Sequence, residues 1–267
     1  MKTIVIPGTD LEVSRFAFGT ASIMRVGMRK ARRRLLAAAV DGGFTLFDTA
    51  PYYGFGVAER DLGAVLKRHP EVRVTTKVGI YVPGGEDQRP SEVFARKVGG
   101  KAFKFLDRPY FDFALKKAQH ALEASLRKLG REHIELYMLH EAQIELLRTD
   151  EWLQWLESAK QAGKIGRFGL ALTAAQLRPF LASSSPLADV VQVLDSLDGR
   201  EADVLGEYHR PLQITFGYIS AARKAGNTST FQELLRAAIV RNPQGPIIVS
   251  TTRAERAALF ERLAAPA

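Results

Sequence analysis

The chain contains no cysteine. This absence excludes disulfide-stapled scaffolds, thiolate zinc sites and catalytic thiols together. Long hydrophobic runs are also missing, because apolar stretches such as Leu35–Val40 are far shorter than the roughly 20 residues that a membrane-spanning helix needs. The first residues carry one positive charge and no apolar core of signal-peptide length. We therefore expect a cytoplasmic protein with no membrane partner.

Internal repeats, low-complexity tracts and interdomain linkers are absent too, and no Gly-x-Gly-x-x-Gly dinucleotide motif occurs. Hydrophobic residues make up 46% of the chain and charged residues 25%, which excludes a disordered chain or a fibre. The length of 267 residues is near the upper limit for one domain and is typical of a closed α/β barrel. We expect one domain over residues 1–267.

Positive charge predominates, since 38 Lys and Arg against 29 Asp and Glu give a formal net charge of +9. Nucleic-acid binding is one interpretation of such a balance. The densest basic run, 29–34, leads directly into the apolar stretch Leu35–Val40, which favours the exposed first turns of an amphipathic helix. Because no aromatic residue interleaves with that run, we expect no nucleic-acid partner. The charge would equally help to attract an anionic small molecule.

Short β-branched runs alternate with longer helical patterns along the whole chain. The expected strands are Arg15–Phe18, Thr45–Phe47, Arg73–Lys77, Glu135–Leu139, Ile165–Gly169, Val190–Leu194, Leu212–Phe216 and Ile247–Ser250. The expected helices are Arg29–Val40, Ala58–Lys67, Phe113–Leu129, Asp150–Ala162, Ala174–Ala182, Gly199–Tyr208, Thr230–Arg241 and Ala254–Leu263. This alternation predicts an α/β fold, a (β/α)8 TIM barrel with an N-terminal β-hairpin around Pro7–Asp10.

Polar residues stand at or just after the ends of three of these strands. They are Asp48, Lys77 and His140, and Tyr53 follows Asp48 by five residues. Parallel strand ends converge on one face of a barrel, and buried charges are costly unless they are paired. We expect Asp48 to pair with Lys77, and the ammonium to lower the pKa of Tyr53 by favouring its phenolate.

With His140 bound to the same substrate oxygen, this group would act as a proton donor for a carbonyl or as a base for an alcohol. Each residue also has a plainer interpretation when taken singly. Asp48 could cap a helix, His140 could be structural and Tyr53 could simply pack. Their joint occurrence at matching strand ends favours the chemical interpretation.

The residues around this group resemble the active-site signature of a known family. Residues 47–54 read Phe-Asp-Thr-Ala-Pro-Tyr-Tyr-Gly, and Glu59-Arg60 and Leu62-Gly63 follow. The pattern is similar to that of the aldo-keto reductases, and within them to the branch that oxidises aldoses such as L-fucose, the D-threo-aldose 1-dehydrogenases. Further matches to that branch are Thr76–Gly79, Tyr110–Phe113, Ser125–Gly130 and Ile134–His140.

The resemblance implies an NAD(P)-dependent oxidoreductase that interconverts an alcohol and a carbonyl (aldehyde, ketone or sugar) by direct hydride transfer, without a metal. Tyr53 would be the general acid/base, tuned by Lys77 and Asp48. His140 would orient the carbonyl. The cofactor would lie extended across the barrel mouth, and the residues implied to bind it are Gly19, Thr20, Gln192, Phe216, Ser250, Thr251, Thr252 and Arg256.

The second half of the chain departs from the family pattern where the cofactor should bind. Ala171 and Leu172 stand where the family has a Ser-Asn pair for the nicotinamide carboxamide, a loss of about 1 kcal/mol for each hydrogen bond. Arg256 takes the place of the Arg that contacts the adenosine 2′-phosphate, which favours NADP. A shift of one residue would place Glu255 there and favour NAD. In the same register Phe260 replaces an Asn of the adenine site.

Substrate and direction are not specified by these motifs. The stretch Val82–Arg108 is long for a barrel connection, so we expect a functional loop over the mouth. Its cations suit a carboxylated or phosphorylated substrate; they are Arg89, Arg96, Lys97, Lys101, Lys104 and Arg108.

Two other functions stay open at this point. Loss of the Ser-Asn pair would suit a binding or regulatory protein with impaired cofactor binding. The polar group could also serve a sugar-modifying enzyme without net redox chemistry. The sequence gives no indication of oligomeric state.

Overall fold

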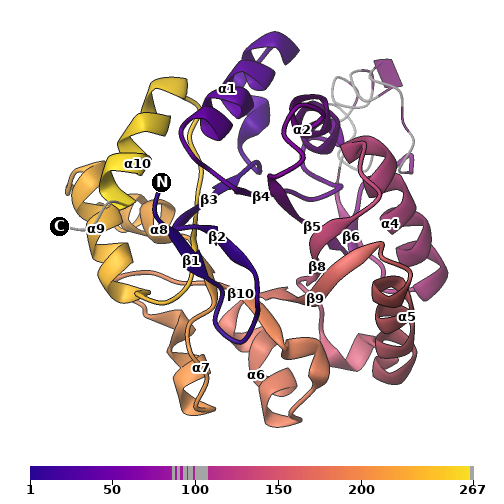
Figure 1. Cartoon of the computed structure of the whole chain (residues 1–267). Helices are drawn as coiled ribbons and strands as arrows, with labels where there is room; N and C mark the ends of the chain where they lie inside the picture. The colour runs from indigo at the N-terminus through magenta and orange to yellow at the C-terminus, as the bar shows by residue number, and fades with distance from the viewer. Residues whose placement is uncertain (86–87, 89–90, 93–94, 96–98, 100–107, 265–267) are drawn as a thin grey trace.

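The computed structural model describes residues 1–85, 88, 91–92, 95, 99 and 108–264, which form a closed barrel of parallel strands surrounded by helices (Figure 1). The predicted (β/α)8 fold is confirmed, and β12 pairs with β3 to close the barrel. In order around the barrel the strands are β3 (Phe16–Gly19), β4 (Leu46–Asp48), β5 (Arg73–Val78), β8 (Ile134–His140), β9 (Ile165–Leu172), β10 (Val190–Leu194), β11 (Ile214–Phe216) and β12 (Ile247–Val249).

Helices cover the outside of the barrel (Figure 1). They are α1 (Arg29–Asp41), α2 (Val57–Leu66), α4 (Leu115–Leu129), α5 (Thr149–Gln161), α6 (Ala174–Ala182), α7 (Val204–Glu207), α8 (Tyr218–Lys224), α9 (Phe231–Arg241) and α10 (Ala257–Ala264). Helix α8 was not predicted; it follows Gly217, whose φ of 111° is a conformation that glycine adopts readily. None of the helices in the described part of the chain is long and apolar enough to span a membrane.

Helix α4 begins two residues later than predicted. The Asp112 side chain accepts a hydrogen bond of 2.9 Å from the Ala114 N–H, and Ala114 is extended, so the helix begins at Leu115. The predicted helix over 199–208 is reduced to the 3-10 turn η5 (Glu201–Asp203) and the short α7.

The predicted hairpin, β1 (Thr3–Val5) with β2 (Glu12–Ser14), lies across the amino end of the barrel (Figure 1). Ile6 and Val13 are fully buried and pack with residues of the barrel interior, among them Leu46. Ser14 and Thr45 exchange hydrogen bonds of 2.7 and 2.9 Å at this end. The hairpin therefore closes the amino end, and the carboxyl end of the strands is the place for a site.

The basic run at the start of α1 is only partly the exposed face that the sequence predicts. Arg32 is buried and places Nε 2.6 Å from Asp61 of α2, and Arg33 Nε lies 3.1 Å from the other carboxylate oxygen. The prediction is therefore wrong for Arg32, whereas the Arg33 side chain stays 40% exposed. Their partner is distant in sequence and becomes a neighbour only because α1 packs against α2.

Two short strands outside the barrel, β6 (Ile80–Tyr81) and β7 (Tyr110–Phe111), pair in antiparallel fashion. Lys117 of α4 contacts both strands of this ribbon, because its Nζ lies 4.4 Å from the ring centroid of Tyr81 and 4.3 Å from that of Tyr110. The ribbon brings together the two ends of the stretch predicted as a loop. Strands of two residues have no readable periodicity, so the sequence did not predict them.

Candidate active site

The ends of β4 and β5 supply a buried ion pair. Lys77 Nζ donates to Asp48 Oδ1 at 2.6 Å and to the Thr49 carbonyl oxygen at 2.9 Å. The Lys77 side chain is fully buried, and the Asp48 side chain is nearly so. The two strands are parallel neighbours with Asp48 opposite Thr75, so their ends bring the two side chains together. The predicted pairing is present.

Burial acts against the charge on both partners. It raises the pKa of Asp48 and lowers the pKa of Lys77, while the attraction between the two opposes both shifts. A hydrogen bond from the Gln192 side chain also works to lower the pKa of Asp48. The pair thus holds two compensating charges where either charge alone would be costly.

Tyr53 lies beside this pair, in the turn between β4 and α2. Gly54 has a φ of 62°, and Met24 packs so closely that a Cβ on Gly54 would lie 2.6 Å from Met24 Cγ. Lys77 Nζ is 5.1 Å from the centroid of the Tyr53 ring, which is 9% exposed. The turn therefore fixes the ring between the ion pair and the cavity described below.

The prediction that Lys77 lowers the pKa of Tyr53 is wrong. Burial raises the pKa of Tyr53 well above its usual value, and nearby negative groups, Asp48 first, raise it further. The ammonium does not reverse this effect because Asp48, only 2.6 Å away, compensates its charge. Tyr53 is therefore a protonated phenol at neutral pH, in the form that can donate a proton.

His140, the last residue of β8, approaches the same point. Its ring centroid lies 6.2 Å from that of Tyr53 and 5.4 Å from that of Tyr52. Burial, aided by the charge of Lys77, lowers the pKa of His140 well below its usual value, so the imidazole is neutral at pH 7. Its Nδ1 is buried and has no hydrogen-bond partner among the described residues. A neutral ring keeps one N–H that can orient a substrate oxygen.

The register of the sheet places two further residues level with His140. His140 is opposite Ala171 on β9, and Ala171 is opposite Gln192 on β10. Gln192 is buried, and its Oε1 has no hydrogen-bond partner in the part of the chain that the structure describes. An unpaired buried amide oxygen is costly, which fits a site whose missing donor comes from a ligand.

These residues surround one cavity of about 560 Å³ at the carboxyl end of the barrel. Asp48, Tyr53 and His140 line it, whereas Lys77 lies behind Asp48. The residues predicted to bind the cofactor that line this cavity are Gly19, Gln192, Phe216 and Ser250. Ala171 and Leu172 also line it, so the departure from the family pattern lies in the cavity wall itself.

The other predicted cofactor residues are not part of this lining in the described structure. Thr20 is fully buried and donates to the Asp48 carbonyl oxygen at 3.0 Å, so it supports the end of β4. Thr251 accepts a hydrogen bond of 3.1 Å from the Arg253 N–H, and Thr252 is exposed. Of the four residues predicted at the end of β12 and after it, Ser250, Thr251, Thr252 and Arg256, only Ser250 lines the cavity in the described structure.

Arg256 and Phe260 belong to an aromatic cluster formed by α9 and the C-terminal segment. The Arg256 guanidinium lies 4.9 Å from the ring centroid of Phe231, whose ring meets that of Phe260 at 5.5 Å. Phe260 is fully buried and also contacts Phe16 and Phe44. Phe260 therefore serves the core, while Arg256 stays partly exposed at the edge of the cluster.

Glu141 also lines the cavity, and the sequence reasoning missed it. Its φ of 51° is uncommon for a residue with a side chain. Its negative charge contributes to the raised pKa values of Tyr52 and Tyr53. Only its place next to His140 could have pointed to it, since a positive φ at a residue other than glycine leaves no mark in the sequence.

Behind β5, Glu59 of α2 is a fully buried carboxylate. It accepts a hydrogen bond of 2.8 Å from Thr76 Oγ1 and lies 3.7 Å from Lys128 Nζ of α4. Its charge also acts to raise the pKa of Lys77. The sequence motif contained Glu59, and the fold gives it a position that links two helices to the strand that carries Lys77.

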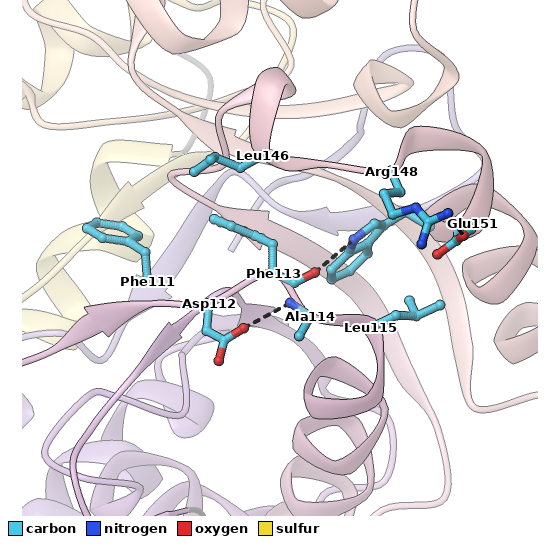
Figure 2. A pocket seen from close by; sticks show the side chains of 9 residues that line it. Phe111, Asp112, Phe113, Ala114, Leu115, Leu146, Arg148 and Glu151 are labelled. Carbon is cyan, nitrogen blue, oxygen red and sulfur yellow. Dashed lines mark hydrogen bonds and ion pairs between the residues drawn. The ribbon is translucent and has the colours of Figure 1, made fainter.

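A second cavity, of about 470 Å³, opens between β7, the 3-10 turn η3 (Ile144–Leu146) and the start of α5. Figure 2 shows Phe111, Phe113 and Leu146 on one side of it and Arg148 with Glu151 on the other. Arg148 Nη2 lies 2.8 Å from Glu151 Oε1. Because this charged pair is satisfied internally, we assign no chemistry to this cavity.

Most of the cations of the stretch Val82–Arg108 are not among the residues that the structure describes. Arg108 is described and exposed. Arg89, Arg96, Lys97, Lys101 and Lys104 lie outside the described residues, so their predicted role at the mouth stays a prediction.

Comparison with known proteins relates the chain to one enzyme family. Residues 15–196, more than half of the chain, match the sequence model of the Aldo/keto reductase family. The chain is similar to the NADH-specific methylglyoxal reductase of Escherichia coli (strain K12), with 31% identity over 192 residues that cover 68% of this chain and 55% of that protein. It is also similar to D-threo-aldose 1-dehydrogenase of Pseudomonas sp, with 34% identity over 111 residues that cover 40% of this chain and 32% of that protein. The chain thus spans about half the length of the first relative.

Solved structures resemble this fold over nearly its whole length. The glycerol dehydrogenase from Gluconobacter oxydans aligns with a TM-score of 0.72 and 21% identity, covering 97% of this chain and 89% of that one. An aldo-keto reductase from Klebsiella pneumoniae in complex with NADPH aligns with a TM-score of 0.68 and 21% identity, covering 98% and 89%. At these identities the likeness concerns the barrel fold.

Proposed function

The chain belongs to the aldo/keto reductase family, and we propose that it is an NAD(P)-dependent oxidoreductase that interconverts a small carbonyl compound and the corresponding alcohol. The observation that carries the proposal is the meeting of Tyr53 and His140 with the buried pair of Lys77 and Asp48 at one cavity. Relatives named for methylglyoxal reduction and for aldose dehydrogenation support this reaction class. The substrate is an aldehyde, a ketone or a sugar.

Tyr53 is the proposed acid for reduction. A bound nicotinamide cofactor supplies the hydride for the carbonyl carbon. The raised pKa keeps the Tyr53 hydroxyl protonated until the carbonyl oxygen gains negative charge and becomes the stronger base. The Lys77 ammonium, 5.1 Å from the ring centroid and held by Asp48, offsets only part of the cost of the phenolate, which therefore regains a proton readily after the reduction. In the oxidative direction the same phenolate removes the alcohol proton.

His140 is the proposed second contact for the carbonyl oxygen. Its neutral imidazole donates one hydrogen bond and does not bring a second positive charge next to Lys77. The rings of Tyr52 and Tyr53 pack against the imidazole and limit its rotation. Substrate orientation therefore comes from His140, and the proton comes from Tyr53.

The cavity offers part of what a nicotinamide ring and its carboxamide need. The unpaired Oε1 of Gln192 would accept from the carboxamide, and Phe216 provides an aromatic wall. Gly19 and Ser250 line the cavity on the side of β3 and β12. Beyond the cavity, the partly exposed Arg256 supports NADP as the cofactor, with NAD as the alternative.

Titration of the purified protein with NADPH and, separately, with NADH tests this function. We expect micromolar binding of at least one cofactor, followed by turnover of some members of a panel of aldehydes, ketones and aldoses. Nicotinamide absorbance reports that turnover directly. Failure of both cofactors to bind would contradict the proposed function.

One observation favours a second candidate. Ala171 and Leu172 leave the cavity wall apolar where the family has a Ser-Asn pair. A protein with weakened cofactor binding would suit a binding or regulatory role, or sugar chemistry without net redox change. Substrate conversion at constant nicotinamide absorbance would support the last of these.

A further inference from the structure

The wall of the main cavity contains an arginine whose charge is not compensated within the described structure. Arg25 belongs to the 3-10 helix η1 (Ile23–Val26), which follows β3. It lines the cavity together with Tyr52, Tyr53 and His140. Among the residues that the structure describes, its guanidinium forms no hydrogen bond and no ion pair.

Three other arginines around the barrel are engaged in the fold. Arg32 pairs with Asp61, and Arg241 Nε lies 2.9 Å from the buried carboxylate of Asp195. Arg223, which also lines the cavity, comes from α8 and donates to the Asn227 carbonyl oxygen at 2.7 Å. Arg25 is exposed at the cavity and differs from these three because, within the part of the chain that the structure describes, all of its side-chain N–H donors are available to a ligand.

The position of Arg25 is tied to the turn that carries the proposed proton donor. Its neighbour Met24 packs against Gly54, the residue that follows Tyr53. The Thr20 N–H, just before η1, donates to the Asp48 carbonyl oxygen at 2.9 Å. The arginine is therefore presented to the cavity by an element anchored on both the ion pair and the tyrosine turn.

The other charges at the cavity determine which ligand group suits Arg25. Asp48 is compensated by Lys77, whereas Glu141 at the end of β8 would repel an anion placed next to it. An anionic group is favoured beside Arg25, whose planar guanidinium matches the oxygens of a carboxylate or a phosphate. The net charge of +9 also favours the approach of an anion.

We propose that Arg25 binds an anionic group of the substrate, so that the enzyme prefers aldehydes or aldoses that carry a carboxylate or a phosphate remote from the carbonyl. This inference rests on the proposed oxidoreductase function. In the reduction, the carbonyl carbon would gain a hydride supplied by bound NAD(P)H, which would be oxidised to NAD(P)+. Tyr53 gives its proton to the oxygen and is reprotonated from water. The anionic group is unchanged and serves only to bind.

Matched substrate pairs test the proposal. They are D-glucuronate against D-glucose and 4-oxobutanoate against butanal for a carboxylate, and D-glucose 6-phosphate against D-glucose for a phosphate. With the wild-type protein, kcat/KM should be higher for the anionic member of at least one pair. Arg25→Gln should lower kcat/KM for that member roughly tenfold or more, as expected for a lost charge-assisted hydrogen bond. The control is Arg29→Gln, at an exposed position at the start of α1 that does not line the cavity. It should leave kcat/KM unchanged for both the anionic and the neutral member of each pair.

Three outcomes of this experiment distinguish the alternatives. Neutral and anionic substrates turned over equally by the wild type would contradict the Arg25 assignment and leave the oxidoreductase function standing. Weaker NADPH or NADH binding by Arg25→Gln, with equal losses for both members of a pair, would assign Arg25 to the cofactor and overturn the proposal. Wild-type protein that binds no cofactor and converts no substrate would contradict the proposed function itself.

Discussion

Lys77 Nζ and Asp48 Oδ1 meet at 2.6 Å at the ends of two neighbouring barrel strands, next to the ring of Tyr53. Both side chains are removed from water, so each depends on the other to keep its charge. Removal of either partner would therefore leave an uncompensated charge inside the barrel, so a substitution here affects stability as well as the chemistry proposed for the carboxyl end.

Lys77→Met should destabilise the protein, and the loss should depend on pH. Removal of one member of a buried pair costs about 3–5 kcal/mol, which is the expected fall in the free energy of unfolding at neutral pH. Burial raises the pKa of Asp48 above its unfolded value of about 3.9, and without Lys77 nothing of comparable size opposes the shift. A raised folded pKa gives stability that is present at low pH and lost as the pH rises. Urea unfolding of variant and wild type in acidic and neutral buffer should show the larger deficit at neutral pH; a larger deficit in acid would disprove this reasoning.

The pH profile of reduction should be flat across the neutral and alkaline range. Activity requires protonated Tyr53 and neutral His140. The pKa of Tyr53 is raised well above 10.0 and that of His140 is lowered well below 6.5. We therefore expect constant kcat between pH 6.5 and 10.0 under saturating conditions. A loss of activity centred near pH 6.5 would show that His140 titrates with an ordinary pKa, and a loss centred near pH 10.0 would show the same for Tyr53.

Glu59→Ala should be far more damaging than removal of an exposed carboxylate. The variant loses the hydrogen bond from Thr76 and the buried charge that faces Lys128, with an expected cost of about 3–5 kcal/mol. Glu157→Ala is the matched control, because Glu157 is an exposed partner of Lys160 and its loss should cost less than about 1 kcal/mol. Similar unfolding free energies for the two variants would refute the proposed link between α2, α4 and β5.

Ala171→Ser combined with Leu172→Asn should tighten cofactor binding. The two side chains line the cavity next to Gln192, and each restored hydrogen bond contributes about 1 kcal/mol. NADPH affinity measured by titration should rise about 5- to 30-fold. Ala175→Ser, on the exposed side of α6, should leave it unchanged. No gain in the double variant would mean that this part of the wall does not hold the carboxamide.

Much of the fold could be predicted because the barrel repeats one simple pattern. Strands such as Glu135–Leu139 are short apolar runs between amphipathic helices, and their polar ends mark the carboxyl face. The convergence of Asp48, Lys77 and His140 follows from that topology. The short ribbon of β6 and β7 and the pairing of Arg32 with Asp61 could not be predicted, since both depend on contacts between segments far apart in sequence.

The directions of the pKa shifts at the site could be assigned only from the structure. Sequence reasoning placed a lysine near Tyr53 but could not weigh burial, the compensating carboxylate and Glu141 against it, so the direction of the pKa shift was wrong. In the same way, the register near the C-terminus placed Phe260 in an adenine site, whereas the fold places it in the core. Both errors concern properties, a pKa and a burial, that depend on neighbours distant in sequence.

The most direct test of the account is the Tyr53→Phe variant, assayed for cofactor binding and for carbonyl reduction on the same preparation. Phenylalanine keeps the ring that packs against Tyr52 and Lys77 and removes only the hydroxyl. The account predicts that kcat for reduction falls at least about 100-fold while the dissociation constant for NADPH or NADH is unchanged. Turnover close to that of the wild type would contradict the assignment of Tyr53 as the proton donor.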